Sequence, residues 1–279
     1  MIRKINFLVI LFILTLPFLS VFGFIKGSFF KPQAINKLQG ESFDYIVLGS
    51  SRGLTTLNTN LIDSLTGLNG YNASMDDQGI NSWSIMLEHI VSKKIEFDTL
   101  ILVFDVGSEN VTEDEFSSNA YRWHSEISKK YVYKKFNLNL LNLSPWIHYN
   151  YWKNNKFLIS SDLIGLFMPS KSNNFDSKGN FTYPSNSGGI SCIDSSRYFL
   201  DLNNSNQLKE IATRCKQNNI YLVVYIAPYR CTKVMTNANT SFNIINHSDI
   251  LENSLYFYDD IHVNRLGRHK ATEEYIKHF

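Results

Sequence analysis

The stretch that decides the fold is Phe43-Asp44-Tyr45-Ile46-Val47-Leu48-Gly49, followed directly by Ser50-Ser51-Arg52-Gly53. The first seven residues form a compact apolar run that ends in a small residue. Such a run is typical of a strand that is buried on both faces of a parallel sheet. The small residues that follow predict a tight turn into a helix, and we expect Gly49 and Gly53 to permit that turn. Ser51 would then lie at the junction between strand and helix.

The segments beyond this junction repeat the alternation of strand and helix. We expect further strands at residues 71–73, 100–104 and 221–226, and helices at about residues 51–65, 80–91, 206–217 and after 264. This order predicts an α/β fold, a three-layer sandwich whose central sheet is mainly parallel and is covered on both faces. In such sheets ligands bind beyond the carboxyl ends of the strands. Ser51 follows the first predicted strand, so we expect it at this edge.

Residues from about 111 to 195 interrupt the alternation. They are rich in aromatic and polar side chains, and residues 170–190 are expected to form a loop because of their Gly, Pro, Asn and Ser content. We therefore predict one domain, residues 40–279, with a helical and loop insertion at about 111–195. The chain is 44% hydrophobic and 19% charged, with a net charge of +2 and no basic cluster. This composition is ordinary for a globular protein and gives no sign of a nucleic-acid partner.

The N-terminal segment, residues 1–30, bears on the location of the protein. Arg3 and Lys4 precede residues 7–25, which carry no charge over nineteen positions. That length is enough for a helix to cross a bilayer, and it favours a signal anchor that attaches the chain to the membrane. A cleaved signal peptide is the alternative, because small residues near Gly23 suit a cleavage site. In both cases we expect the rest of the chain outside the cytoplasm, in a bacterial periplasm, on the cell surface or secreted.

The three cysteines are Cys192, Cys215 and Cys231. The chain contains no Cys-x-x-Cys and no pair of histidines at the spacing of metal ligands, so neither a disulfide framework nor a zinc site is indicated. We expect the cysteines to be small buried hydrophobic residues, although one disulfide is compatible with a location outside the cytoplasm. No metal and no organic cofactor is predicted.

Ser51 and His262 are the candidate nucleophile and base. A serine hydroxyl needs a base, an orienting acid and donors for the developing oxyanion. In Asp259-Asp260-Ile261-His262 the three-residue spacing allows the Asp259 carboxylate to reach Nδ1 of His262, which leaves Nε2 for a serine. Residues 49–53 also match Gly-x-Ser-x-Gly, the nucleophile elbow of α/β-hydrolases. That fold places the elbow deep in the chain and separates the acid widely from the histidine, so we reject it.

These positions resemble the SGNH or GDSL-type hydrolases, which have the nucleophile after the first strand and an Asp-x-x-His motif near the C-terminus. The resemblance covers most of residues 43–110 and 205–279 and implies a flavodoxin-like sandwich. It also implies Ser51 as nucleophile, His262 as base and Asp259 as orienting acid, while Asp260 has the wrong spacing.

The same resemblance suggests donors for the oxyanion hole. Gly79 resembles the glycine whose backbone N–H serves this hole together with the N–H of Ser51. The sequence departs from the family pattern in two places, since Ser50 replaces the usual Asp and no Gly-x-Asn-Asp follows the third strand. Asn110 is the nearest asparagine, and it is expected either as a side-chain donor or as a loop residue that caps the next turn.

The Gly-Ser-Ser-Arg variant, the hydrophobic N-terminal segment and Ile226-Ala227-Pro228-Tyr229 resemble the membrane-anchored branch of this superfamily that is associated with bacterial envelope polymers. This resemblance implies an esterase or O-acyltransferase that acts on a cell-envelope or exported polysaccharide through a Ser51 acyl-enzyme. The partner would be an acylated glycan. A non-catalytic glycan-binding or envelope assembly protein with the same fold is the alternative. Hydrolysis and transfer share one acyl-enzyme, so the sequence does not separate them.

Arg52, beside the nucleophile, is a candidate substrate-binding residue, because its guanidinium group could attract an anionic polymer or a carboxylate. The alternatives are that Arg52 packs against the start of the following helix or pairs with Asp76 or Asp77.

Overall fold

The computed structural model describes residues 31–76, 78–110, 123, 130–135, 175–183, 196–237, 240–251 and 253–279. The chain divides into two compact units. One comprises Met1–Lys37 and Glu115–Asn174, and its described helices are α2 (Lys31–Asn36) and α6 (Lys130–Lys135). The other comprises Leu38–Asp114 and Phe175–Phe279 and holds the remaining elements. The predicted anchor at residues 1–30 and most of the insertion lie outside the described residues. Among the helices of the described part, none has the length and apolarity needed to cross a membrane.

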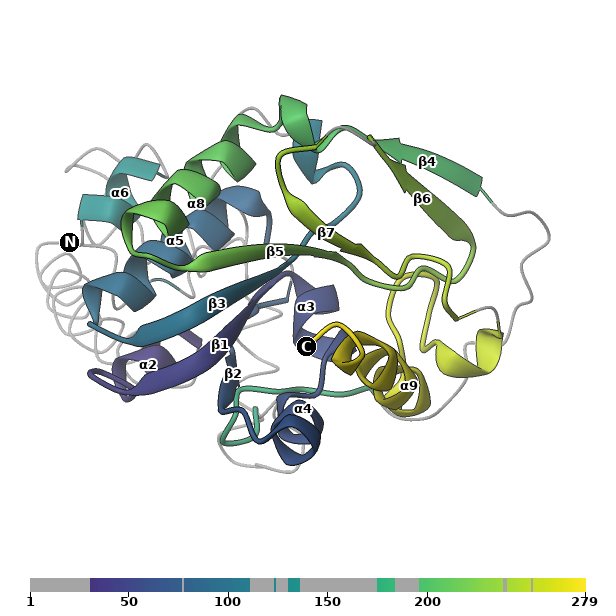
Figure 1. Cartoon of the computed structure of the whole chain (residues 1–279), viewed down its shortest axis with the longest axis horizontal. Coiled ribbons are helices and arrows are strands. Elements are labelled where there is room, and N and C mark those ends of the chain that lie inside the picture. Colours follow the sequence, from purple (N-terminus) through teal and green to yellow (C-terminus); the bar gives the residue numbers. More distant parts are fainter. Residues whose placement is uncertain are drawn as a thin grey trace, which may run out of the picture. The chain divides into compact units, whose positions relative to one another are not determined.

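The second unit is built on a five-stranded, all-parallel sheet with the order β2-β1-β3-β5-β7 (Figure 1). Its strands are β1 (Ser42–Gly49), β2 (Gly70–Asn72), β3 (Glu96–Val103), β5 (Tyr221–Ile226) and β7 (Asn243–Asn246). The last residues of β1, β3 and β5 are buried, as the apolar runs predict for central parallel strands.

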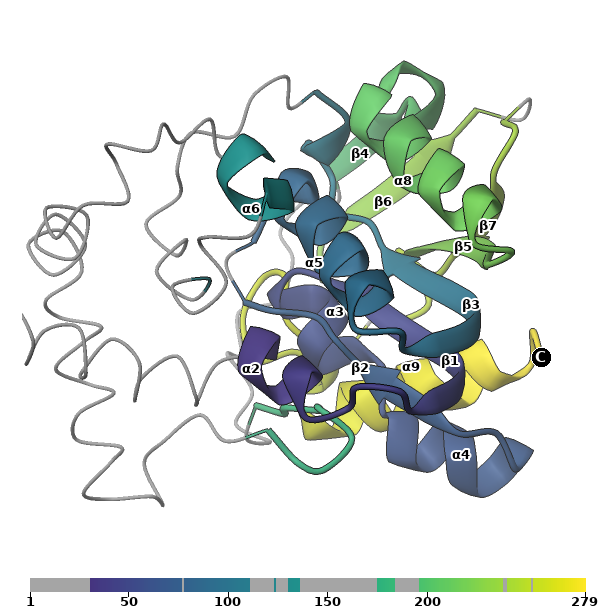
Figure 2. The ribbon, with the colours of Figure 1, turned by 90° about the vertical axis from the view of Figure 1, so that its left-hand side faces the viewer.

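Helices cover both faces of this sheet. The helices are α3 (Ser51–Thr56), α4 (Thr59–Thr66), α5 (Ile80–Ser92), α8 (Asn206–Gln217) and α9 (Arg265–Ile276). α5 and α8 pack together on one face, and α3 and α4 pack with α9 on the other (Figures 1 and 2). The predicted three-layer α/β sandwich with a parallel sheet is therefore confirmed.

The same unit also contains shorter elements. A separate two-stranded parallel sheet pairs β4 (Ser196–Leu200) with β6 (Thr232–Thr236). The 3-10 helices in the described part of this unit are η1 (Ser108–Asn110), η5 (Leu202–Asn204) and η6 (Ser254–Tyr256). Cys231, directly before β6, is disulfide-bonded, whereas Cys215 is a free thiol whose pKa burial raises to about 12. The expectation of buried, unpaired cysteines is thus correct for Cys215 and wrong for Cys231.

The strand order creates a crevice between β1 and β3. The chain runs from β1 to β2 on one side and then crosses to β3 on the other, so the connections leave in opposite directions at the carboxyl ends of β1 and β3. Gly49 and Val103 are paired at these ends. The residues that follow, Ser51 after β1 and Asp105 after β3, are thereby placed at the position where sheets of this order bind ligands.

Gly49 and Gly53 are required by close packing at this crevice. A Cβ atom on Gly49 would lie 2.8 Å from the carbonyl oxygen of Val103, and one on Gly53 would lie 2.6 Å from Oγ of Ser74. Neither glycine has a positive φ angle. The two glycines therefore allow the strand and helix to approach their neighbours, and the turn itself does not need a left-handed residue.

Candidate active site

The structure brings Ser51, His262 and Asp259 into one hydrogen-bonded chain. Ser51 is the first residue of α3, and the other two lie in the loop between η6 and α9. Nε2 of His262 lies 2.7 Å from Oγ of Ser51, and Nδ1 lies 2.8 Å from Oδ2 of Asp259. This is the order of groups that a serine nucleophile, a base and an orienting acid require.

The loop of residues 258–262 is a closed turn built around Asp259. Oδ1 of Asp259 accepts hydrogen bonds from the backbone N–H groups of Ile261 at 3.0 Å and His262 at 2.8 Å. The N–H of Tyr258 donates to the carbonyl of His262 at 2.8 Å, which closes the turn. Asp260 points elsewhere, because its side chain is 78% exposed and pairs with Arg230. The structure thus uses the carboxylate three residues before the histidine, as its spacing predicts.

Asn264 ties this loop to the last helix. Its Oδ1 caps α9 by accepting the N–H groups of Leu266 at 2.9 Å and Gly267 at 3.1 Å. Its Nδ2 donates to the carbonyl of Leu255 at 2.7 Å. Asn264 is fully buried, so these bonds are shielded from water. The segment that carries His262 is therefore fixed where it enters the helix.

The electrostatics of the loop favour an ionised Asp259. Burial by itself raises the pKa of this carboxyl, but the hydrogen bonds from the His262 imidazole and from the backbone N–H groups of Ile261 and His262 outweigh burial and lower it. An ionised Asp259 accepts a hydrogen bond from the N–H at Nδ1, so Nε2 is the unprotonated nitrogen that faces Ser51. His262 is then oriented to take the hydroxyl proton of Ser51.

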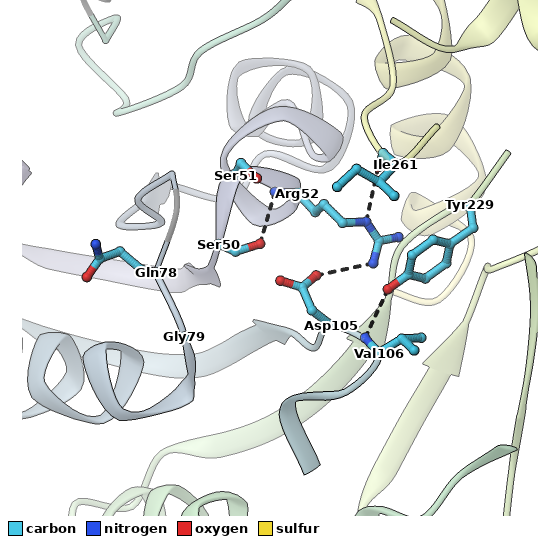
Figure 3. Close-up of a pocket in the computed structure, with 9 residues that line it drawn as sticks. All are labelled: Ser50, Ser51, Arg52, Gln78, Gly79, Asp105, Val106, Tyr229 and Ile261. Carbon is cyan, nitrogen blue, oxygen red and sulfur yellow. Dashed lines mark hydrogen bonds and ion pairs between the residues drawn. The ribbon is translucent and has the colours of Figure 1, made fainter. Parts of the chain in front are cut away.

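Gly79 and Ser51 line a common cavity of about 490 Å³. The cavity is lined by Ser50, Ser51, Arg52, Gln78, Gly79, Asp105, Val106, Tyr229 and Ile261 (Figure 3). Gly79 is the N-cap residue of α5 and has an extended backbone. Within the described residues, neither the N–H of Gly79 nor that of Ser51 has a hydrogen-bond acceptor. Both are available to bind a negative oxygen in the cavity, the role predicted for them.

Asn110 is the last residue of η1, but its side chain lies outside the described part of the structure. Its role as an oxyanion donor stays a prediction. Asp105, five residues earlier, does line the cavity.

Arg52 is engaged inside the protein. Its side chain is 3% exposed, and its guanidinium group donates to Asp105 and to the carbonyl of Ile261 (Figure 3). It also donates to the carbonyls of Ala227 and Pro228. Four of its five N–H groups have partners in this way. Its carboxylate partner is Asp105 and not Asp76, and Asp77 lies outside the described residues. These contacts favour a structural role over the predicted substrate-binding role, for which one N–H is left.

Tyr183 is a residue of the site that no sequence pattern indicates. Its ring stacks on Tyr258 with centroids 4.4 Å apart and lies 5.2 Å from the ring of His262. Tyr183 also forms an isolated bridge with Asn264, and burial raises the pKa of its hydroxyl. It belongs to a segment whose Gly, Pro, Asn and Ser content predicts only a loop. Its contact with His262 depends on tertiary structure that no local pattern indicates.

Among the described residues, no group of three or more His, Cys, Asp and Glu side chains is arranged to hold a metal ion. Comparison of the chain with protein-family models, with curated proteins and with solved structures finds no match.

Proposed function

We propose that the protein is a serine-dependent acyl-ester hydrolase or O-acyltransferase that carries the acyl group on Ser51. The observation that supports this function is the continuous chain of hydrogen bonds, 2.8 Å and 2.7 Å long, from Asp259 through His262 to Oγ of Ser51. Its position at the crevice between β1 and β3, beside two backbone N–H groups without acceptors among the described residues, adds to this support.

The proposed reaction begins with attack of Ser51 Oγ on the ester carbonyl, while its proton passes to Nε2 of His262. Asp259 stays ionised and stabilises the imidazolium group. The N–H groups of Ser51 and Gly79 bind the oxyanion of the tetrahedral intermediate. The C–O bond to the leaving alcohol then breaks as His262 returns the proton to the alcohol oxygen, which leaves an ester on Ser51. In the second half of the reaction, the oxygen of a water molecule or of a sugar hydroxyl attacks the ester carbonyl on Ser51 while His262 takes its proton. The C–O bond to Ser51 then breaks, and His262 returns the proton to Oγ of Ser51.

The substrate we propose is an acylated glycan of the cell envelope or an exported polysaccharide. The resemblance of residues 43–110 and 205–279 to the SGNH hydrolases supports this choice, as does the uncharged segment at residues 7–25. The disulfide at Cys231 agrees with an oxidising location outside the cytoplasm. Whether water or a sugar hydroxyl completes the reaction depends on the acceptor surface, which is expected within residues 111–195.

Labelling with a fluorophosphonate tests the proposal. The wild-type chain should form an adduct that mass spectrometry locates on Ser51, and Ser51→Ala should give no adduct and no turnover of p-nitrophenyl acetate. Ser64→Ala, which alters a serine of α4 that donates to the carbonyl of Leu61, should label as the wild type does. Full turnover in Ser51→Ala would refute the proposal. Binding of polysaccharide without any turnover in the wild type would instead favour the non-catalytic glycan-binding alternative.

A further experiment separates hydrolysis from transfer. The wild-type chain is incubated with an O-acetylated oligosaccharide and a second, unacetylated one. A transferase should move the acetyl group to the second oligosaccharide, whereas a hydrolase should release acetate only. Both outcomes require Ser51, so Ser51→Ala is the control for each.

A further inference from the structure

Arg52 is a buried charge directly beside the proposed nucleophile. In Figure 3 its guanidinium group lies between the carboxylate of Asp105, the ring of Tyr229 and the backbone of Ile261. Removal of a guanidinium group from water is unfavourable unless partners within the protein offset it. The contacts of Arg52 therefore show which groups of the protein stabilise the buried guanidinium group.

Two of the segments that Arg52 contacts follow neighbouring strands of the sheet. Nη1 lies 3.2 Å from Asp105, after β3. Nη2 donates to the carbonyls of Ala227 at 2.7 Å and Pro228 at 2.9 Å, after β5. The guanidinium carbon lies 3.4 Å above the ring centroid of Tyr229. The hydrogen bonds thus fix the guanidinium group within its own plane, and the ring of Tyr229 fixes it in the direction perpendicular to that plane.

The remaining contact reaches the loop that carries His262. Nε of Arg52 donates to the carbonyl oxygen of Ile261 at 3.2 Å. The carbonyl of Ile261 and the N–H of His262 belong to one peptide unit, which is planar and rigid. Asp259 accepts that N–H at 2.8 Å, so both polar groups of the unit are held.

The hydrogen bond from Arg52 to the carbonyl of Ile261 ties the loop to the segments that follow the strands, and it is made by a side chain that is only 3% exposed. A second contact within the described residues comes from Arg230, whose backbone N–H donates to the carbonyl of Asp260 at 3.3 Å and whose side chain pairs with the Asp260 carboxylate, which is 78% exposed. Ion pairs with an exposed partner contribute little to stability. Ile261 itself is 45% exposed, so burial of its side chain does not anchor the loop strongly.

We propose that Arg52 is a positioning residue: it holds the peptide unit between Ile261 and His262, and so keeps the imidazole at hydrogen-bond distance from Ser51. The inference rests on the proposed function, in which Ser51 is the nucleophile and His262 the base. Because Arg52 follows Ser51 in the chain, the residue that places the base is covalently attached to the nucleophile. A lysine in its place would offer one flexible point charge and would not bond to Asp105, Ile261 and the carbonyls after β5 together.

The test compares Arg52→Lys with Arg268→Lys. Arg268 is a matched control, because it is 6% exposed and its guanidinium group donates to the carbonyls of Leu57 and Phe181, outside residues 259–262. With p-nitrophenyl acetate we expect Arg52→Lys to lower kcat by about 10- to 100-fold with little change in KM, since misplacement of a reacting group by about 1 Å has effects of this size. Arg268→Lys should keep kcat within about threefold even if it is less stable.

Hydrogen exchange measured by NMR provides a readout that does not need turnover. The amides of Ile261 and His262 should exchange about 10-fold faster in Arg52→Lys than in the wild type, while the amide of Trp83, which donates to Gly79, should not change. If the wild type fails to label at Ser51, the proposed function is wrong, and the exchange rates still test the hold of Arg52 on the loop. Wild-type kcat together with wild-type protection in Arg52→Lys would overturn the inference.

Asp105→Asn covers the case in which Arg52→Lys does not fold. This variant keeps the guanidinium group and an acceptor oxygen but removes the charge that orients Nη1. We expect a loss of kcat of about 3- to 10-fold and faster exchange at His262, because a charge-assisted hydrogen bond becomes a neutral one. Unchanged kcat and unchanged exchange would again contradict the positioning role.

Discussion

Asp259 carries the charge on which the orientation of His262 depends. Its side chain is 45% exposed, so water competes with its partners. Despite burial, the hydrogen bonds from the imidazole and from two backbone N–H groups lower the pKa of the carboxyl. The carboxylate therefore stays charged as the pH falls into the range in which an ordinary aspartate takes up a proton. At neutral pH Asp259 is a fixed anion beside Nδ1.

The variant Asp259→Asn tests this role. The amide can present an N–H to Nδ1, which favours the tautomer with its proton on Nε2 and blocks proton uptake from Ser51. We expect kcat to fall by about 10³- to 10⁴-fold while the fold is kept, as for the loss of this acid in other serine enzymes. Asp260→Asn is the control, because that carboxylate is 78% exposed and should change kcat little. Equal kcat values for the two variants would argue against Asp259 as the orienting acid.

His247 is a buried base outside the candidate site. It is 7% exposed, packs edge-on against Tyr225 and has its Nε2 3.1 Å from Nε2 of His278. Burial, followed by the nearby His278, lowers the pKa of His247 to about 4, with Lys277 acting in the same direction and Glu274 and Asp249 opposing it. The folded chain therefore takes up this proton at a lower pH than the unfolded chain does.

The pKa of His247 predicts how stability depends on pH. The unfolded state protonates near the ordinary value of 6.5 and the folded state only near 4, so the unfolded state binds more protons between these values. The free energy of unfolding should fall as the pH is lowered through this window. Urea denaturation at pH values across it should show this slope in the wild type and a shallower one in His247→Gln. His269→Gln, at a side chain that is 59% exposed, should keep the wild-type slope.

At the scale of elements, the ends of β1 and β3 must approach closely for Ser51 to reach the crevice. Gly49 stands opposite Val103 in the register of these strands, and a Cβ there would meet the Val103 carbonyl at 2.8 Å and its Cβ at 3.0 Å. Backbone atoms of two central strands cannot move aside as a flexible side chain can. A larger residue at position 49 would therefore push the two strands apart.

Gly49→Ala should lower the free energy of unfolding by about 1–3 kcal/mol, the usual effect of overpacking in a well-packed core. It should also slow fluorophosphonate labelling, because Ser51 is two residues away and moves with the end of β1. Chemical denaturation and labelling rates provide the two measurements. Glu96→Ala, at the exposed start of β3, is the control and should change neither. A Gly49→Ala chain as stable as the wild type would show that the strands have room to adjust.

At the scale of the whole molecule, the sequence predicts the central strands and the edge strand β2, but neither the edge strand β7 nor the separate pair of β4 and β6. β1, β3 and β5 contain long apolar runs, as fully buried parallel strands must. β7, with the sequence Asn-Ile-Ile-Asn, and the partly exposed β4 have short or polar patterns that local reasoning does not separate from loops. β7 and β4 form because they pair with β5 and β6, strands that local sequence patterns do not relate to them.

The candidate site shows the same division. Ser51 and the Asp259–His262 pair have recognisable spacing beside predicted elements, and the structure brings them together. The interactions of Arg52 were not predictable, because three of its four hydrogen-bond partners are backbone carbonyls, which every residue possesses. Tyr183 was not predictable either, since its neighbours in sequence predict only a loop. Contacts of these kinds become visible only once the fold places distant segments together.

The described residues of the candidate site all belong to the unit formed by Leu38–Asp114 and Phe175–Phe279. This unit also contains the whole parallel sheet and the helices on both of its faces. We therefore expect a chain in which residues 115–174 are replaced by a flexible Gly/Ser linker to fold and to label at Ser51 with a small fluorophosphonate. Ser51→Ala in the same shortened chain is the control.

Transfer to a polysaccharide acceptor should respond differently to this replacement. If residues 115–174 contribute the acceptor surface, the shortened chain should hydrolyse p-nitrophenyl acetate at a rate within about threefold of the full chain, because a small ester engages only the groups around the nucleophile. Its rate of acyl transfer to an oligosaccharide should fall by 10-fold or more, since positioning of the second reactant is lost. A folded shortened chain that no longer labels would show instead that residues 115–174 supply part of the site around Ser51.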